Sequence, residues 1–126
     1  MLLPDNNSKT TTSGGLRALY FYLSSYCNLN CIHCWISPRY INDIRAPEEA
    51  DIGLLKDIID QALPLGLKLI KITGGEPFLN KNIFSLIAYA RNKKLSVGIE
   101  TNGTLINDET ADFLRRNAVR QVSVSL

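Results

Sequence analysis

The feature that most constrains the fold is an alternation between short apolar segments and longer segments with helical periodicity. The apolar segments cover residues 16–24, 67–73, 95–100 and 119–126, and each is too short for a typical helix. Two of the three segments between them carry apolar residues at helical spacing, and the third, DETADFLRR, follows an asparagine that can cap a helix. This β-α-β-α-β-α-β order predicts an α/β fold with a parallel sheet, because each helix carries the chain back to the same end of the sheet.

Residues near the ends of the three expected helices support this order. The first helix is predicted to begin near Pro47, because proline suits the first helical position, and Pro64 is expected to stop it. Asn80 or Asn82 can cap the second helix and Asn107 the third, since asparagine side chains accept hydrogen bonds from free backbone N–H groups. The expected buried positions are Ile52, Leu55, Ile58, Ile59 and Ala62 in the first helix and Ile83, Leu86, Ile87 and Ala90 in the second.

The chain has 126 residues, which is enough for one domain with a real core. Residues 1–15 are polar, with a threonine run and a glycine pair, and indicate a disordered tail before a domain at 16–126. No helix follows the fourth expected strand to cover it. Either a partner completes the sheet or the chain is the front part of a longer barrel, and we favour the second interpretation.

Composition argues against several classes of partner and location. The net charge is +2 with scattered basic residues, and RNKK at 91–94 is typical of a solvated helix end, so we expect no nucleic-acid partner. The N-terminus does not resemble a signal peptide, and no window approaches the roughly 20 apolar residues of a membrane-spanning helix. We therefore expect a cytoplasmic protein, in which structural disulfides are rare.

All three cysteines lie in one stretch, YCNLNCIHCW at 26–35, where Cys27, Cys31 and Cys34 are spaced C-x3-C-x2-C. An odd number of cysteines cannot all pair within one chain, so metal binding is the leading interpretation. A structural zinc site needs four ligands, and His33 could be the fourth, but its adjacency to Cys34 makes joint coordination of one ion difficult. A [4Fe-4S] cluster takes one thiolate per iron, so three thiolates leave one iron open, as in a catalytic centre.

Polar segments follow each of the four expected strands. CNLNCIHC follows the first strand, GGEP (74–77) the second and TNG (101–103) the third, while Ser123 and Ser125 lie at the end of the fourth. In parallel α/β folds, functional residues gather at the carboxyl ends of the strands. The sequence therefore predicts one site formed by these four segments.

Together these motifs resemble the radical S-adenosylmethionine (SAM) superfamily. The resemblance rests on CNLNCIHCW, with the aromatic Trp35 after the third cysteine, and on GGEP after the second strand. It covers about residues 16–126, and TNGTL and VSVSL fall where many members carry similar segments. It implies a partial (β/α)6 barrel with four strands present, and a [4Fe-4S] cluster and SAM as cofactors. Within the family, GGEPFLN and TNGTLI are most similar to members with C-terminal SPASM or twitch domains.

The resemblance also implies roles for the cluster loop and the glycine motif. The thiolates of the three cysteines would hold three irons, and the amino and carboxylate groups of SAM would chelate the fourth. Gly74 and Gly75 would let the backbone approach the cofactor closely. The methionyl amino group would meet this segment through backbone carbonyls and Glu76.

Four further residues are candidate cofactor contacts. The backbone around His33 would meet the adenine, although a role in loop packing is the alternative, and Trp35 would pack on the cluster loop. Asn102 either touches the cofactor or substrate or serves an ordinary Asn-Gly turn. Ser125 resembles the strand hydroxyl that contacts the ribose or carboxylate of SAM in some members.

The activity implied by the resemblance is reductive cleavage of SAM to methionine and a 5′-deoxyadenosyl radical that abstracts hydrogen from a substrate. A reductant such as flavodoxin or ferredoxin would supply the electron. The related subgroup modifies peptides or matures cofactors, so the expected substrate is a peptide or a tetrapyrrole. The alternative is a non-catalytic iron–sulfur or zinc-binding module, and SAM binding discriminates between the two.

Overall fold

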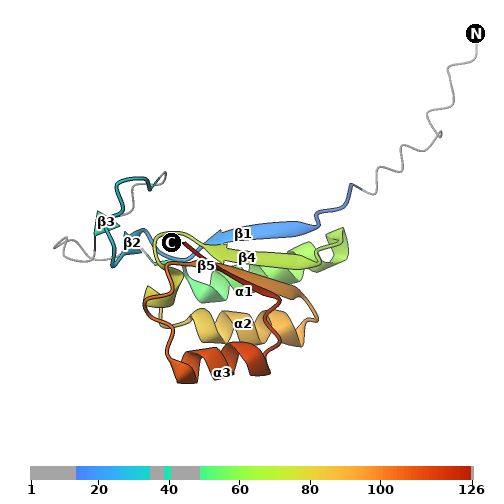
Figure 1. Ribbon diagram of the computed structural model, residues 1–126. Helices are drawn as coiled ribbons and strands as arrows, with labels where there is room; N and C mark the ends of the chain where they lie inside the picture. Colours follow the sequence, from blue (N-terminus) through green and yellow to red (C-terminus); the bar gives the residue numbers. More distant parts are fainter. Residues whose placement is uncertain (1–13, 35–38, 41–48, 126) are drawn as a thin grey trace, which may run out of the picture.

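The computed structural model describes residues 14–34, 39–40 and 49–125. Four parallel strands form the main sheet, with helices packed on one of its faces (Figure 1). The strands are β1 (Ala18–Tyr22), β4 (Leu69–Thr73), β5 (Ser96–Thr101) and β6 (Gln121–Val124), in the spatial order β1-β4-β5-β6. The predicted α/β class with four parallel strands is therefore confirmed.

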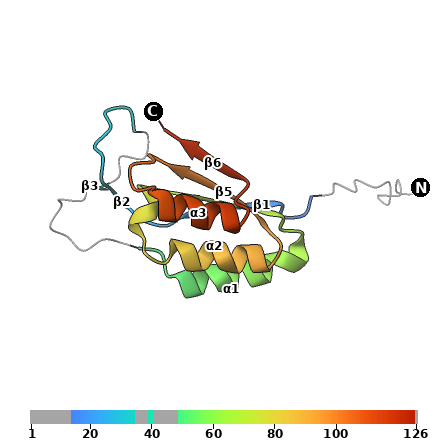
Figure 2. The ribbon, with the colours of Figure 1, turned by 60° about the horizontal axis from the view of Figure 1, so that its bottom comes forward.

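Three α-helices connect successive strands of the main sheet. They are α1 (Ile52–Ala62), α2 (Ile83–Asn92) and α3 (Asp108–Arg116), with short 3-10 turns η1 (Leu63–Leu65) and η2 (Pro77–Leu79). Figures 1 and 2 show the helices side by side across one face of the sheet. Within the ranges that the structure describes, no helix is both long and apolar enough to cross a membrane.

The start of α1 differs from the prediction. The helix begins at Ile52 and not near Pro47, which itself lies outside the described residues. Asp51 occupies the capping position, and its carboxylate accepts hydrogen bonds from two backbone N–H groups of the first turn at 2.8 and 3.3 Å. Just before it, the Ala50 N–H donates to the Leu23 carbonyl at 3.0 Å. This bond holds the chain beside the end of β1, so the helix starts later than its proline suggests.

The predicted cap of α3 by Asn107 is confirmed. At the start of α2, one asparagine occupies the capping position and the side chain of another accepts the hydrogen bond. The Asn107 side chain accepts a hydrogen bond from the Thr110 N–H at 2.8 Å. Asn82 occupies the capping position of α2 without a capping bond from its own side chain. Its N–H donates instead to the side chain of the buried Asn80 at 3.0 Å, and the Asn80 amide donates to the Leu23 carbonyl at 3.2 Å. Asn80 thus joins the start of α2 to the end of β1.

A second, two-stranded parallel sheet lies beside the main one. It pairs β2 (Tyr26–Cys27) with β3 (Arg39–Tyr40). The stretch ISPRYINDIRA at 36–46 has no clean period, and from the sequence alone it is interpreted as loop. The structure shows that this is wrong at β3, and the rest of the stretch lies outside the described residues. Two-residue strands are too short to show the alternation by which strands are recognised in a sequence.

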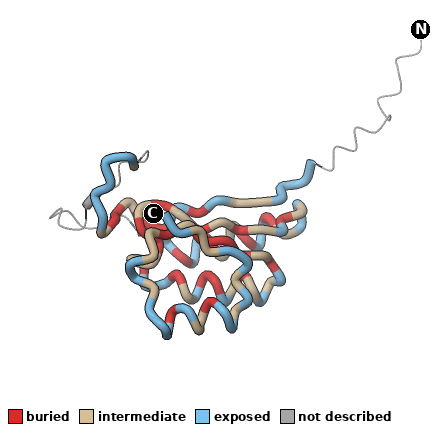
Figure 3. The backbone as a smooth tube through the Cα atoms, in the orientation of Figure 1, coloured by how far each residue is buried: buried red, intermediate tan, exposed pale blue. Residues whose placement is uncertain are grey.

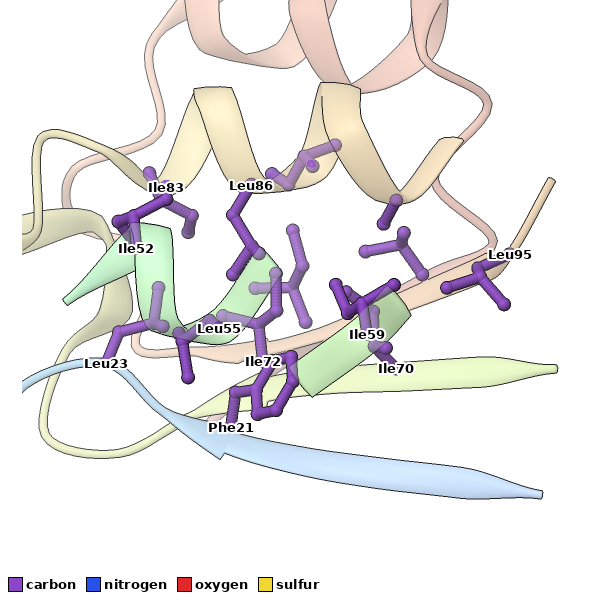
Figure 4. Packing of buried hydrophobic residues seen from close by; sticks show 14 of the residues in the cluster. Phe21, Leu23, Ile52, Leu55, Ile59, Ile70, Ile72, Ile83, Leu86 and Leu95 are labelled. Carbon is purple, nitrogen blue, oxygen red and sulfur yellow. The ribbon is translucent and has the colours of Figure 1, made fainter. Parts of the chain in front are cut away.

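The hydrophobic core lies between the helices and the main sheet (Figure 4). All of the expected helix positions are buried except Ile58, which packs against the core while partly exposed. The sheet contributes Phe21, Ile70, Ile72, Val97 and Ile99. Figure 3 shows the resulting alternation of buried and more exposed residues along strands and helices. Full burial of an Ile, Leu or Phe side chain stabilises a fold by about 1.5–3 kcal/mol, so this layer positions the strand ends firmly.

The opposite face of the sheet carries polar and aromatic side chains. Tyr20 and Tyr22 of β1 are 58% and 50% exposed, whereas Phe21 between them is buried. On the neighbouring strands, the Lys71 ammonium lies 3.3 Å from the Glu100 carboxylate and 5.8 Å from the centre of the Tyr20 ring. This face therefore presents charge and aromatic rings beside the carboxyl ends of the strands.

A polar cluster joins α1 to α2 on the outer surface. The Tyr89 hydroxyl lies 2.7 and 2.6 Å from the two carboxylate oxygens of Asp60, and the Lys93 ammonium is 3.4 Å from one of them. The ammonium groups of Lys56 and Lys93 lie 5.3 and 5.2 Å from the centre of the Tyr89 ring. The hydrogen bond from Tyr89, with a smaller effect of Lys93, holds the pKa of Asp60 below its usual range.

Tyr89→Phe is expected to raise the pKa of Asp60, because it removes the hydroxyl that stabilises the carboxylate. A group with a lowered folded-state pKa stabilises the fold above its unfolded pKa, and this contribution disappears as the pH falls through the folded pKa. The variant should therefore be less stable than the parent at neutral pH, and the difference should shrink at acid pH. Titration of side-chain carboxyl ¹³C resonances by NMR measures the pKa directly.

Asp112 of α3 is the internal control for that titration. Its pKa is lowered by a hydrogen bond from Arg115 and by Arg116, and all three residues belong to α3, whereas Tyr89 belongs to α2. Its titration should be the same in parent and variant. An unchanged Asp60 titration in Tyr89→Phe would show that the hydroxyl does not set this pKa.

Candidate cofactor-binding site

A pocket of about 190 Å³ opens at the carboxyl ends of the strands. All three cysteines line it. Four of the other predicted site residues line it as well, namely His33, Gly75, Asn102 and Ser125. The structure therefore brings residues from four separate segments of the chain to one place, as the common end of parallel strands requires.

The three cysteines surround the pocket at different depths. Cys27 ends β2 and is buried, Cys31 is exposed and Cys34 is half-buried. The Cys34 N–H donates to the Cys31 carbonyl at 3.2 Å, which closes the tight turn between them. Among the residues that the structure describes, no three His, Cys, Asp or Glu side chains lie close enough together to hold a metal ion. The three cysteines thus border one pocket without converging on a single point.

The glycine motif after β4 is packed against the chain that follows β1. Gly74 and Gly75 both have positive φ, +90° and +43°, which residues with a Cβ rarely adopt. A Cβ at Gly74 would lie 2.8 Å from the Tyr22 side chain, and one at Gly75 would collide with the Tyr26 carbonyl oxygen. The next N–H, that of Glu76, donates to this same Tyr26 oxygen at 2.8 Å. Both positions therefore require glycine because of their close neighbours in the chain at and after the end of β1.

Glu76 is completely buried, and its carboxylate faces β5. One oxygen accepts hydrogen bonds from the Thr101 hydroxyl at 2.6 Å and the Phe78 N–H at 3.2 Å. The other accepts from the Asn102 N–H at 2.8 Å. Glu76 does not line the pocket, and neither does Gly74. The carboxylate thus ties the loop after β4 to the end of β5, and the sequence alone does not reveal Thr101 as its partner.

A hydrogen-bonded clamp joins the cysteine loop to the turn after β5. The Asn102 amide nitrogen donates to the Asn28 side-chain oxygen at 2.8 Å and lies 3.7 Å from the Cys27 sulfur. The Asn28 amide in turn donates to the Thr104 hydroxyl at 2.8 Å. Sequence reasoning does not single out Asn28 or Thr104, although both lie inside the quoted motifs CNLNC and TNGTL.

Two other pocket residues come from the polar face of the sheet. Glu100 lines the pocket and accepts a hydrogen bond from the Thr73 hydroxyl at 3.1 Å, besides its 3.3 Å contact with Lys71. Thr73 also lines the pocket. The alternation of polar and apolar residues along the expected strands could have indicated these positions, because alternate residues of a strand share one face.

The remaining predicted residues differ in how well the structure describes them. The Ser125 N–H donates to the Thr101 carbonyl at 3.0 Å, which fixes this serine at the pocket. His33 lines the pocket with an exposed side chain. Trp35 lies outside the described residues.

Comparison with known families and proteins identifies close likenesses over most of the chain. The model of the Radical SAM superfamily matches residues 21–126. Fe-coproporphyrin III synthase of Methanosarcina barkeri is 39% identical over 100 residues, which cover 79% of this chain and 24% of that protein. Mycofactocin maturase MftC of Mycolicibacterium smegmatis is 33% identical over 108 residues, covering 86% of this chain and 26% of the maturase.

A solved structure shares the fold as well. Streptococcus suis SuiB bound to S-adenosylmethionine superposes with a TM-score of 0.71 and 28% identity over 86% of this chain and 24% of SuiB. SuiB has also been solved bound to the precursor peptide SuiA. The chain spans about a quarter of the length of these relatives. The family match, the relatives and the shared barrel fold show that this chain belongs to the radical SAM superfamily, whose members are enzymes that use a [4Fe-4S] cluster and SAM.

Proposed function

We propose that this chain forms the cofactor-binding part of a radical SAM enzyme, with Cys27, Cys31 and Cys34 as the ligands of a [4Fe-4S] cluster. The observation that carries the proposal is that all three cysteines line one pocket with residues from the ends of the other strands. When bound, the cluster and SAM supply reductive cleavage of the SAM C5′–S bond, and with it a 5′-deoxyadenosyl radical that abstracts hydrogen from a substrate.

The protein's own residues hold and orient these groups. Gly75 presents backbone at the pocket without a side chain, so the methionyl amino group can approach its carbonyl. Glu76 acts as a positioning residue, because its carboxylate is occupied by three donors from the protein. We assign the Ser125 hydroxyl to the ribose or carboxylate of SAM, and the backbone around His33 to its adenine. Trp35 would cover the cluster loop.

The activity of the whole protein is proposed from its relatives. They include a Fe-coproporphyrin III synthase, a mycofactocin maturase and SuiB, which was solved with a precursor peptide. We therefore propose that the protein acts in the cytoplasm on a peptide or a tetrapyrrole, as a member of the SPASM or twitch subgroup. A flavodoxin or ferredoxin would supply the electron.

Anaerobic reconstitution with iron and sulfide, followed by low-temperature EPR of the reduced chain, tests the proposal. We expect a [4Fe-4S]⁺ signal whose g-values shift on addition of SAM, because three thiolates leave one iron open to it. Cys31→Ser should abolish the normal signal. Ile32→Ser is the matched control, since Ile32 lies in the same loop, is fully exposed and does not line the pocket.

Two results would contradict the proposal in different ways. Tight zinc binding without cluster assembly would favour the zinc-binding module that the sequence left open. A cluster signal that does not respond to SAM would favour a non-catalytic iron–sulfur module.

A further inference from the structure

The side chain of Asn102 uses all of its hydrogen-bonding capacity within the protein. Its oxygen accepts from the Thr104 N–H at 3.0 Å and the Thr104 hydroxyl at 2.8 Å. Its nitrogen donates to the Asn28 side-chain oxygen at 2.8 Å and lies 3.7 Å from the Cys27 sulfur. A carboxamide has two N–H donors and two acceptor lone pairs, so each is matched by one protein partner.

These partners also decide which end of the amide faces the sulfur. A backbone N–H can only donate, so the group facing the Thr104 N–H must be the Asn102 oxygen. The NH₂ group therefore points toward Cys27. The backbone of Asn102 is fixed independently, because its own N–H donates to the buried Glu76 carboxylate at 2.8 Å.

Cys27 is the best shielded of the three cysteines and receives a second donor. It is 7% exposed, and the Leu29 N–H points at its sulfur at 3.4 Å. The environment of this sulfur therefore consists of two N–H dipoles with little water. Hydrogen bonds to ligating sulfurs and exposure to solvent are among the factors that set the reduction potential of iron–sulfur clusters.

We infer that Asn102 is a positioning residue for the ligand Cys27. The Asn102 side-chain N–H donates a hydrogen bond to the Cys27 sulfur, and this bond raises the reduction potential of the cluster. One-electron reduction by an external donor of the flavodoxin or ferredoxin class adds one negative charge to the cluster and its thiolates. An N–H dipole directed at a thiolate stabilises that added charge. The inference rests on the proposed function, and it assigns Asn102 to the sulfur and not to SAM or the substrate.

An EPR-monitored redox titration of the reconstituted chain without SAM tests the inference. Asn102→Ala should lower the equilibrium constant for one-electron reduction about tenfold, which corresponds to about 59 mV. Thr104→Val is the matched control, because it disturbs the same clamp but leaves the Asn102 NH₂ group facing Cys27. For Thr104→Val, the equilibrium constant for one-electron reduction should stay within about twofold of the parent value.

A second measurement needs no substitution and decides the matter if Asn102→Ala takes up no cluster. The unsubstituted chain is prepared with ¹⁵N in the asparagine side chains, and its reduced cluster is examined by pulsed EPR. A hyperfine coupling to the labelled nitrogen is expected through the N–H···S contact. The Asn28 side-chain nitrogen donates to Thr104 and not to a sulfur, so it should not contribute.

The outcomes separate this inference from the proposed function. A cluster in the unsubstituted chain without ¹⁵N coupling would overturn the role of Asn102 and leave the proposed function intact. A reduction potential unchanged in Asn102→Ala, or lowered equally in Thr104→Val, would overturn it as well. Failure of the unsubstituted chain to assemble any cluster would overturn the proposed function itself.

Discussion

Gly75→Ala should destabilise the chain by about 3 kcal/mol or more and disrupt the pocket at the strand ends. A left-handed backbone costs about 1–2 kcal/mol for a residue with a Cβ, and overpacking costs about 1–3 kcal/mol more. Gly75 has φ of +43°, and an added Cβ would collide with the Tyr26 carbonyl oxygen and lie 2.9 Å from the Ser24 carbonyl oxygen. These neighbours are backbone atoms, so they cannot move aside as a flexible side chain could. The Glu76 N–H would then lose its bond to Tyr26.

Gly98→Ala provides the matched control, because Gly98 lies in β5 without a positive φ. A Cβ there would make ordinary contacts of 3.5 and 3.6 Å with the flexible Lys71 side chain. We expect its free energy of unfolding to change by less than about 1 kcal/mol, since alanine also lowers the entropy of the unfolded chain. Urea unfolding followed by circular dichroism measures both variants. Equal midpoints for the two would show that the chain around Tyr26 yields to a Cβ.

Glu76→Ala is expected to cost about 3 kcal/mol and to loosen the link between the loop after β4 and the end of β5. The substitution leaves three donors without their acceptor, and a buried unsatisfied group costs about 1–3 kcal/mol. Those donors are the Thr101 hydroxyl and the N–H groups of Phe78 and Asn102. Glu76→Gln should be milder but still destabilising, because its NH₂ group must face one of these donors.

Glu100→Ala controls for the loss of a carboxylate near the same pocket. The Glu100 side chain is 45% exposed, and its ion pair with Lys71 is therefore weakened by water. We expect its removal to change the free energy of unfolding by less than about 1 kcal/mol. Urea unfolding gives the free energy of unfolding of both variants, provided that its slope against urea concentration stays unchanged. Similar losses of unfolding free energy in Glu76→Ala and Glu100→Ala would contradict the role of the buried Glu76 carboxylate in linking the loop after β4 to the end of β5.

Periodicity and capping chemistry account for the part of the fold that could be predicted. The buried stripes of α1 and α2 follow from apolar spacing, and the Asn107 cap follows from the hydrogen-bonding of asparagine at a free helix end. The convergence of the cysteines with Gly75 and Ser125 follows from the parallel order of the strands. Each of these inferences needs only residues close in sequence, or the common end of a parallel sheet.

The features that escaped prediction depend on contacts between distant residues. Thr101 meets Glu76 across 25 positions, and Asn102 meets Asn28 across 74. No local pattern encodes such pairs, because Asn28 and Asn102 are equally suited to ordinary turns and Thr101 is an ordinary strand residue. The late start of α1 likewise reflects the bond from Ala50 to Leu23 and not the residues of the helix itself.

The order of the strands also bears on the sequence of events during folding. Ala18 of β1 pairs with Leu69, whereas Leu69 pairs with Ser96 and Gly98 with Gln121, so the first pairing closes about twice the length of chain. Pairings between distant segments cost more entropy and form more slowly. This favours early assembly of β4, β5 and β6, with β1 added at the edge afterwards. The cysteine loop follows β1, so its thiols would join the pocket after the residues that β4, β5 and β6 contribute to it are already in place.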